Sequence, residues 1–479
     1  MIGRVKEQNE LIRRYRGDRA EFIAVYGRRR VGKTYLIDET FRDKITFRHA
    51  GLSPVEESGT GRMKAQLEQF YFSLLKHGMK RSHRPEDWLE AFFMLEMFLQ
   101  ERDDGTRQVI FLDELPWLDT PRSGFITALE GFWNNWCCYR HNVMLIVCGS
   151  SSSWILDKLL NNHGGLYGRI THEIKLAPLN LYESEALLRE NGVQLSRYDI
   201  TQSYMILGGI PYYLNYFEPG LSMAQNIDNL FFSKQAKLND EYHRLFTSVF
   251  ESPEYMKKLV ETISRRNMGY TRKELVKTPG FSEGTRLTDA LRALVSSDFV
   301  IRYVPFGYSK REVHYKLADP FCIFWLHFLA DLKGNSENFW QSLQESPKGN
   351  IWNGLAFEQV CFQHVSQIKF KLGISGIRTN ESSWALKNEA GDGAQIDLLL
   401  DRSDNVINAC EIKFSAKEYR VDKEYYQLLL HRHAILREAV PGRKTILNTL
   451  ITTMGLVYNE YSGFFSNVIT LDDLFRAMP

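Results

Sequence analysis

The hydrophobic pattern of the first 175 residues consists of continuous apolar runs separated by amphipathic stretches. The runs lie at 22–26, 109–112 and 143–148. A strand that is covered on both faces carries such a run, because neither face meets water. Helical stretches lie between the runs, and this alternation predicts a parallel sheet covered by helices. The fold class predicted for this part is α/β.

The rest of the chain divides into three further parts. Residues 176–248 read as a helical lid, bent at Gly208-Gly209-Ile210-Pro211. Residues 249–335 hold two short helical stretches, a strand-like run and an aromatic helix face that we assign to core packing. Residues 333–350, rich in Gly, Ser, Asn and Lys, read as a linker. We therefore predict a multidomain chain with boundaries at 1–175, 176–248, 249–335 and 345–479.

Composition excludes little. The chain has 479 residues, with 60 Lys and Arg against 58 Asp and Glu, so its global charge argues neither for nor against nucleic acid. No uncharged apolar run of about 18 residues occurs, so we expect no membrane partner. The six cysteines show no metal-ligand spacing and the charged N-terminus is unlike a secretory signal. These features favour a cytoplasmic protein.

A phosphate-loop pattern is satisfied in full by Gly27-Arg28-Arg29-Arg30-Val31-Gly32-Lys33-Thr34, between a strand-like run and a helix. The backbone N–H groups of such a loop cradle anionic phosphates. Lys33 is expected to reach the β- and γ-phosphates, and the Thr34 hydroxyl to ligate Mg²⁺. The sequence therefore predicts ATP and Mg²⁺ as cofactors. A glycine turn that happens to carry Lys-Thr is the alternative.

Polar side chains follow the next two apolar runs. Asp113 and Glu114 form an acidic pair at a strand end, which is costly without a cation or partner. We expect Asp113 to hold the Mg²⁺ shell and Glu114 to orient or deprotonate the attacking water. Ser150 is expected to contact the γ-phosphate or that water. Capping of the following helix is the alternative for the carboxylate and for Ser150.

Arg169 follows a glycine-rich loop and is a candidate for charge stabilisation, in cis or in trans, with an ordinary surface arginine as the alternative. The motifs together resemble the prokaryotic AAA-type ATPases of the archaeal ATPase family, related to the STAND class. The motifs are Ile2-Gly3-Arg4, the phosphate loop, Leu112-Asp113-Glu114, Gly149-Ser150, Leu166 to Arg169 and Gly208 to Pro211. The resemblance spans roughly the first half and implies that Gly3, Arg4 and Pro211 line an adenine pocket.

The segments at 271–275, 284–287 and 299–303 follow the order helix, turn, helix and wing. This order resembles the winged-helix domain that follows such ATPase modules. A second helix bearing Arg286 and Arg292 would enter a DNA groove. Winged helices also serve as packing modules, so both interpretations stay open.

A second constellation lies in the last third. Two strand-like stretches, 395–400 and 406–413, are joined by turn residues. A hairpin that is symmetric about Asp404 places Asp397 opposite Glu411, and strand alternation puts Lys413 on the face of Glu411. Two carboxylates would bind Mg²⁺ while the lysine holds or activates water. A surface ion cluster is the alternative.

Asp397 and Glu411-Ile412-Lys413 resemble the signature of the PD-(D/E)XK nucleases. Glu358 resembles the extra acidic residue of the first helix of that fold, which implies Glu358, Asp397 and Glu411 as metal ligands. Ile396 replaces the proline that often precedes the first aspartate. A nearby face either contacts a nucleic-acid backbone or is solvated: Lys417, Tyr419, Arg420, Lys423, Tyr425 and Tyr426.

The leading interpretation is an ATP-binding and ATP-hydrolysing AAA-type protein that acts on nucleic acid, DNA before RNA, through a Mg²⁺-dependent nuclease effector. One alternative is an ATP-gated scaffold, and another is a nucleic-acid sensor, each with an inactive last domain. A homo-oligomer or a partner protein is a further expectation, the partner protein in the scaffold alternative.

Overall fold

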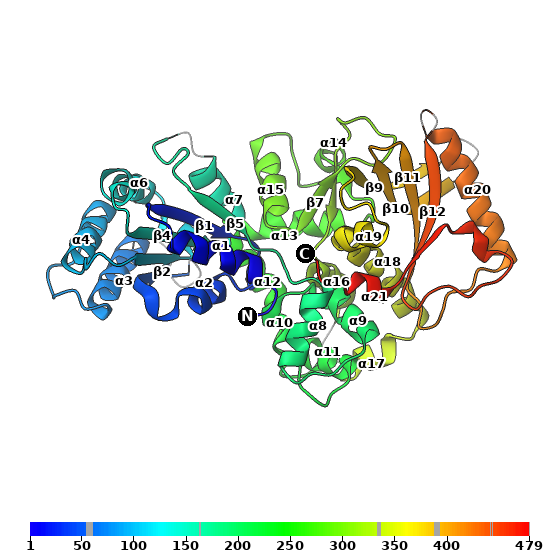
Figure 1. Cartoon of the computed structure of the whole chain (residues 1–479), viewed down its shortest axis with the longest axis horizontal. Coiled ribbons are helices and arrows are strands. Elements are labelled where there is room, and N and C mark those ends of the chain that lie inside the picture. Colours follow the sequence, from blue (N-terminus) through cyan, green and yellow to red (C-terminus); the bar gives the residue numbers. More distant parts are fainter. Residues whose placement is uncertain are drawn as a thin grey trace. The chain divides into compact units, whose positions relative to one another are not determined.

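The computed structural model describes residues 1–478 except 54–60, 162–163, 333–336, 388–392, 441 and 443. The chain forms two compact units (Figure 1). The first unit comprises Met1–Pro178, His243–Lys257 and Thr288–Asp298, and the second comprises Leu179–Tyr242, Lys258–Leu287 and Phe299–Pro479. Among the described residues, no helix is long and apolar enough to span a lipid bilayer.

A five-stranded parallel sheet forms the centre of the first unit, as the apolar runs predict. Its order is β2-β3-β4-β1-β5. Every residue of β1, β3 and β4 is buried, because helices cover the sheet and leave no face to water. The strands are β1 (Glu21–Tyr26), β2 (Ile45–Ala50), β3 (Gln108–Asp113), β4 (Val143–Gly149) and β5 (His172–Lys175).

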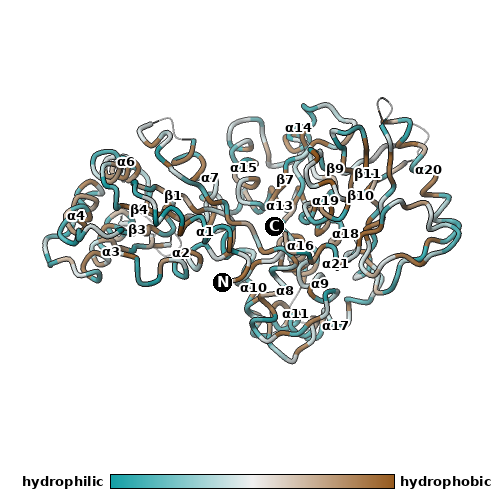
Figure 2. The backbone as a smooth tube through the Cα atoms, in the orientation of Figure 1, coloured by the Kyte–Doolittle hydropathy of each residue, from teal (hydrophilic) through white to brown (hydrophobic). Residues whose placement is uncertain are grey.

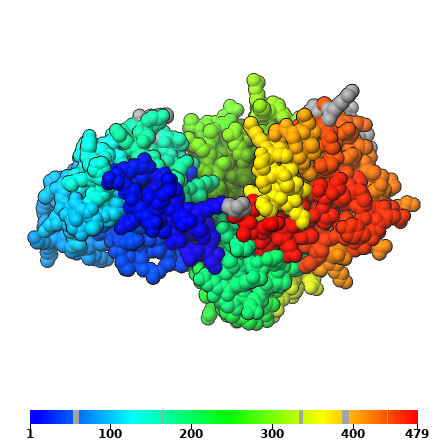
Figure 3. All heavy atoms as spheres, viewed as in Figure 1, coloured from blue at the N-terminus to red at the C-terminus, as the bar shows by residue number. Residues whose placement is uncertain are grey.

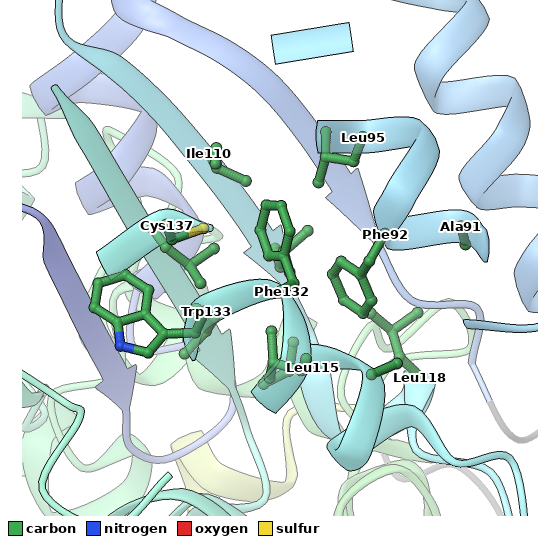
Figure 4. Packing of buried hydrophobic residues seen from close by; sticks show 14 of the residues in the cluster. Ala91, Phe92, Leu95, Ile110, Leu115, Leu118, Phe132, Trp133 and Cys137 are labelled. Atoms are coloured by element: carbon green, nitrogen blue, oxygen red, sulfur yellow. The ribbon is translucent and has the colours of Figure 1, made fainter. Parts of the chain in front are cut away.

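An aromatic core packs helices α4 and α6 against this sheet. Phe92 of α4 stacks on Phe132 of α6 with ring centroids 5.2 Å apart, and Ile110 of β3 belongs to the same cluster (Figure 4). The helices of this unit are α1 (Val5–Tyr15), α2 (Lys33–Phe41), η1 (Arg42–Lys44), α3 (Arg62–Lys76), α4 (Trp88–Glu101), α5 (Leu115–Leu118), α6 (Phe125–Asn135), η2 (Cys137–Tyr139), α7 (Ser152–Ile155) and η3 (Leu156–Leu160). The packed core fixes the strand ends that carry the polar residues.

Helices begin the second unit, as predicted for 176–248. They are α8 (Leu181–Glu190), α9 (Arg197–Leu207), α10 (Pro211–Leu214) and α11 (Met223–Phe231). The chain passes between the units within α12 (Glu241–Val249), α13 (Pro253–Ser264) and α15 (Thr285–Ser296). Hydrophobic residues, brown in Figure 2, concentrate in the strands and in the inner faces of such helices.

The linker expected at 333–350 is wrong for its described part. Residues 333–336 lie outside the described residues, but α17 (Phe339–Leu343) and the start of α18 (Pro347–Gln363) are helical. Trp340 is fully buried against Phe324 and Phe328 of α16 (Pro320–Phe328), which confirms the predicted aromatic packing. The carboxylate of Asp228 also accepts the N–H of Trp340 over 2.7 Å. Polar composition misled here because the buried Trp340 anchors the segment.

A small sheet of order β6-β8-β7 follows α13. It comprises β6 (Tyr270–Thr271), β7 (Val300–Tyr303) and β8 (His314–Leu317), with α14 (Arg272–Val276) after β6. The β7–β8 connection packs through Phe306 against Trp384 and Ile396 of the C-terminal sheet. The β7–β8 connection and the C-terminal sheet both belong to the second unit, so this contact lies within one unit.

The C-terminal sheet has the order β13-β12-β11-β10-β9. Its first three strands along the chain pair antiparallel, whereas β12 and β13 are parallel to β11. The elements are α19 (Val365–Lys371), β9 (Thr379–Lys387), β10 (Gly393–Arg402), β11 (Val406–Lys413), α20 (Lys423–Ala439), β12 (Thr445–Thr452), η4 (Ser462–Phe464), β13 (Asn467–Ile469) and α21 (Leu471–Leu474). The C-terminal segment lies against α19 through the Lys371–Asp473 ion pair (Figure 3).

Candidate functional sites

The phosphate loop connects β1 to α2, as expected from the sequence. A side chain at Gly27 would place its Cβ 2.3 Å from the carbonyl oxygen of Leu176, so only glycine fits there. Gly32 precedes α2 with φ 94°, in the left-handed region. Lys33 is therefore the first residue of α2, where the free N–H groups of a helix start point outward.

The Lys33 ammonium lies across the mouth of this loop. It donates to the carbonyl oxygens of Gly27 and Arg28 at 3.0 and 3.1 Å, and to the hydroxyl of Ser150 at 3.2 Å. Lys33 is 5% exposed, and burial lowers its pKa. A buried ammonium with only neutral partners is a strong attractor for an anion.

Thr34 and Asp113 meet beside the loop. The Thr34 hydroxyl donates to Asp113 Oδ2 over 2.7 Å. Burial and the negative charge of Glu114 raise the pKa of Asp113, although its hydrogen bond with Thr34 opposes the shift. A hydroxyl and a buried carboxylate are oxygen donors of the kind Mg²⁺ takes, and a cation would relieve the raised pKa. The donor set therefore fits Mg²⁺.

Glu114 and Ser150 form a third contact beside the phosphate loop. The Ser150 hydroxyl donates to Glu114 Oε1 over 2.6 Å, and the Ser150 N–H donates to Glu114 Oε2 over 3.1 Å. Glu114 has φ 46°, an unfavourable conformation for a residue with a side chain, of the kind that gathers at functional sites. Ser150 does not cap α7, because that helix begins at Ser152 after Ser151. The capping alternative for Ser150 is wrong.

Arg4 connects the phosphate loop to the segment that follows β5. Its guanidinium donates to the carbonyl oxygens of Val31 at 3.1 Å and Ala177 at 2.7 Å. Gly3 precedes it with φ 66°, and the Arg29 guanidinium lies over the Trp117 ring, 5.8 Å from its centroid. Sequence analysis missed Trp117. Arg28 is buried, Arg30 has φ 71°, and Pro211 begins α10 in the second unit, so the adenine pocket remains a prediction.

Arg169 lies near the opposite end of β1. Its neighbour Thr171 donates through its N–H to Phe22 at the start of that strand, whereas the phosphate loop follows Tyr26 at the other end. Phe22 and Gly27 are five residue steps apart along the strand, a span of about 17 Å at roughly 3.3 Å per residue. Arg169 is exposed and has no ion pair with a described residue. An extended arginine reaches only about 7 Å, two residue lengths.

The predicted hairpin of the C-terminal sheet is confirmed. Leu398 pairs with Cys410 and Leu400 with Asn408, so continuing the register sets Asp397 opposite Glu411. Asp397 Oδ2 accepts the N–H of Ile412 over 2.9 Å. Burial and the charges of Glu411 and Glu358 raise the pKa of Asp397 to about 7.

Three side chains hold the Glu411 carboxylate. Lys413 pairs with it at 2.8 Å, Arg432 of α20 lies at 3.3 Å, and the Tyr425 hydroxyl donates to it. Burial lowers the pKa of Lys413, but the charge and hydrogen bond of Glu411 outweigh this and raise it. Sequence analysis missed Arg432 and did not foresee that Tyr425 binds this carboxylate.

Glu358 of α18 lies near this pair but is held by other partners. Its carboxylate is hydrogen bonded by the side chain of Asn267, and burial raises its pKa while the charge of Lys316 opposes the shift. In the part of the chain that the structure describes, no three His, Cys, Asp or Glu side chains converge to hold a metal. The three-carboxylate set stays a prediction, and the Asp397 and Glu411 pair offers oxygen donors of the kind a divalent cation takes.

The face downstream of β11 is not uniform. Tyr419, Tyr425 and Tyr426 pack against a hydrophobic cluster around Val421 and Leu429. The basic members Lys417, Arg420 and Lys423 are exposed. The backbone contact of this face therefore stays a prediction, with the basic residues as its exposed part.

Comparison with known proteins gives four findings. Residues 1–217 match the family described as an ATPase domain predominantly from Archaea. An uncharacterized protein of Methanocaldococcus jannaschii is 25% identical over 443 residues, which cover 91% of this chain and 92% of that protein. The Walker-type ATPase of Pyrococcus abyssi has 18% identity and a TM-score of 0.47, covering 68% of this chain and 96% of that one.

The structure of the Aeropyrum pernix ORC2 protein, in ADPNP and ADP complexes, is 12% identical with a TM-score of 0.39, covering 68% of this chain and 93% of that chain. The match over residues 1–217 includes the loop, Asp113, Glu114 and Ser150. Residues 1–217 thus form an ATPase domain of the archaeal ATPase family, and the chain is an ATPase.

Proposed function

We propose that this ATPase acts on nucleic acid and that its C-terminal sheet carries a metal-dependent phosphodiesterase site. The observation that carries the proposal is the β10–β11 hairpin, which opposes Asp397 to Glu411 and pairs Lys413 with Glu411. Burial and the negative charges of Glu411 and Glu358 oppose ionisation of the Asp397 carboxyl group and raise its pKa. A divalent cation would balance that charge.

The order of elements supports the nuclease assignment. Helix α18 precedes the antiparallel strands β9, β10 and β11, and α20 then leads to β12, which is parallel to β11. The PD-(D/E)XK nuclease core has this order of helix, meander, helix and parallel strand. Glu358 on α18 and the pair on the hairpin occupy positions that match its signature.

In this site Asp397 and Glu411 would hold Mg²⁺, which when bound would polarise the phosphodiester and acidify water. The Lys413 ammonium carries donors only, so it orients the attacking water or the phosphate oxygen and is not a ligand. Tyr425 and Arg432 hold the Glu411 carboxylate in place from α20. The predicted substrate is therefore a phosphodiester, DNA before RNA.

In the ATPase domain we assign a role in ATP hydrolysis to each polar residue around the phosphate loop. Lys33 exchanges its neutral partners for β- and γ-phosphate oxygens, while Thr34 and Asp113 would hold Mg²⁺, whose charge would offset that of the phosphates. Glu114, oriented by Ser150, takes the proton of the attacking water.

Arg169 is assigned to a neighbouring copy of the chain. The span from the start of β1 to its own phosphate loop, about 17 Å, exceeds the reach of the side chain. An exposed arginine at this edge is available to a second protomer, so action in trans requires a homo-oligomer.

The segment with α14, α15, β7 and β8 has the order of a winged helix. Phe306 in the β7–β8 connection is covered by the C-terminal sheet, so we assign the wing to packing. Arg292 is paired with Asp157 at 3.1 Å and with Asp289 at 3.3 Å. Arg286 is exposed, and we propose both arginines of this helix as candidates for DNA contact.

A second candidate is an ATP-gated scaffold or nucleic-acid sensor that cuts nothing. The observation that favours it is the Glu411 carboxylate, which Tyr425, Lys413 and Arg432 already occupy. A site that never releases Glu411 would bind nucleic acid without a metal.

The test is degradation of a panel of single- and double-stranded DNA and RNA in Mg²⁺ and in Mn²⁺, with and without ATP. Wild type should cut at least one substrate, and Asp397→Ala should cut none. Asp401→Ala is the matched control, because Asp401 lies on the same strand but pairs with Lys444. No cutting by wild type, or equal cutting by Asp397→Ala, favours the scaffold.

A further inference from the structure

A pocket of about 310 Å³ lies in the second unit beside α18. Arg265, Arg266 and Lys316 line it together with His327, whose pKa burial lowers, and among the described residues no carboxylate does. We call it the basic pocket. A cavity with several cationic side chains and no acidic one favours an anionic ligand.

The basic pocket adjoins the proposed phosphodiesterase site. Lys316 and Asn267 line the pocket, and the Asn267 side chain hydrogen bonds to the Glu358 carboxylate. Leu355 and Gln359 of α18 also line it, one turn apart, and Glu358 follows Leu355 by three residues on the same helix. One end of a ligand in the pocket would therefore lie near the Glu358 carboxylate.

Two buried polar groups that line the pocket lack a partner among the described residues. They are Oε1 of Gln359, in a side chain that is 6% exposed, and Nε1 of Trp352, in one that is 3% exposed. A buried acceptor and a buried donor without partners are costly unless a ligand or water satisfies them. Together they match the donors and acceptors of a nucleobase edge.

The wall also has an apolar part, which includes Ile323, Leu326 and Leu355. The volume lies at the lower end of the ~300–1,000 Å³ range of small-ligand sites. One nucleotide unit fits this size, whereas several do not. Arg266 is paired with Glu274 at 2.9 Å, so exposed Arg265 is the arginine that would meet a phosphate at the mouth.

We propose that the basic pocket binds the terminal, phosphorylated nucleotide of a single-stranded nucleic acid whose next phosphodiester lies at the Asp397–Glu411 pair. The phosphate contacts Arg265 and Lys316, and the base lies against the apolar wall near Trp352 and Gln359. This inference rests on the proposed function, since it names the substrate of that site.

The test measures binding by fluorescence anisotropy of short oligodeoxynucleotides that carry a 5′-phosphate, a 3′-phosphate or only hydroxyl ends. The full chain is used with EDTA, so that no strand is cut. Wild type should prefer one phosphorylated end, and Arg265→Ala should lose that preference with about tenfold weaker binding. Arg311→Ala, an exposed arginine of the same unit outside the pocket, should bind like wild type. Ala356→Phe, which fills the pocket, should also lose the preference.

Equal affinity of wild type for all three ends would overturn the proposal, as would equal effects of Arg265→Ala and Arg311→Ala. Full displacement by a nucleoside monophosphate at the concentration of the oligonucleotide would assign the pocket to a free nucleotide instead. A phosphate preference without any cleavage would retain the pocket and refute the nuclease. Cleavage without the preference would retain the nuclease and refute the pocket.

Discussion

Replacing Ser150 with alanine removes a hydroxyl that joins the Lys33 ammonium to the Glu114 carboxylate. The hydroxyl donates to Glu114 over 2.6 Å and accepts from Lys33 at 3.2 Å. The N–H of residue 150 would still donate to Glu114 Oε2, so the carboxylate keeps one of its two contacts. The substitution therefore loosens Glu114 without freeing it.

The expected size follows from that contact. A hydrogen bond to a charged group contributes about 1.5–3 kcal/mol, which corresponds to roughly 10- to 150-fold in rate. If Glu114 takes the proton of the attacking water, Ser150→Ala lowers kcat for ATP hydrolysis by about that factor. ATP affinity should change less than about threefold, because Lys33 keeps its phosphate contact and loses only a long hydrogen bond to a hydroxyl that it exchanges for phosphate oxygens.

The assay combines phosphate release for kcat with isothermal titration for affinity. Ser152→Ala is the matched control, since Ser152 is also buried at the same strand end but its hydroxyl has no partner among the described residues. In a Glu114→Gln background, Ser150→Ala should add little, because the two residues act as one unit. Wild-type turnover in Ser150→Ala, or an equal loss in Ser152→Ala, would refute this reasoning.

Three further predictions concern the remaining groups. Lys33→Ala should abolish tight ATP binding in isothermal titration, because the ammonium at the loop mouth is lost; unchanged affinity would contradict its role. Arg169→Ala should slow phosphate release more than it weakens ATP binding, and adding Lys33→Ala chains, which keep Arg169, should restore turnover; no rescue would argue against action in trans. The raised pKa of Asp397, about 7, means that the folded chain keeps a proton which the unfolded chain releases near pH 4, so this carboxyl group lowers the free energy of unfolding progressively from about pH 4 to 7. Thermal unfolding should show less pH dependence in Asp397→Asn, and Mg²⁺ should stabilise wild type increasingly as the pH rises through 7; equal profiles for both proteins would contradict the shift.

The parallel sheet and the loop group were predictable because their signals are local. Each apolar run became a buried strand, and each polar residue placed at a strand end lies at the same sheet edge. The carboxyl ends of parallel strands lie at one edge of the sheet, so these polar residues share that edge whatever the order of the strands. The hairpin register was also local, since a tight turn fixes which residues face each other.

The partners of the C-terminal carboxylates were not predictable in this way. Tyr425 and Arg432 reach Glu411 from α20, and Lys316 and Asn267 approach Glu358 from the small sheet and the segment before it. These contacts depend on how distant elements pack, which no sequence period encodes. The linker prediction for the segment after residue 337 failed for a related reason, because its polar composition does not indicate that Trp340 is buried.

Phosphate release and strand cleavage measured in the same reactions test the central claim most directly, which is that one chain holds two separate hydrolytic sites. Wild type, Lys33→Ala and Asp397→Ala would be incubated with ATP, Mg²⁺ and the substrate that wild type cuts. The account predicts that Asp397→Ala loses cleavage and keeps ATP hydrolysis, while Lys33→Ala loses ATP hydrolysis. Cleavage by Asp397→Ala at the rate of wild type would contradict it.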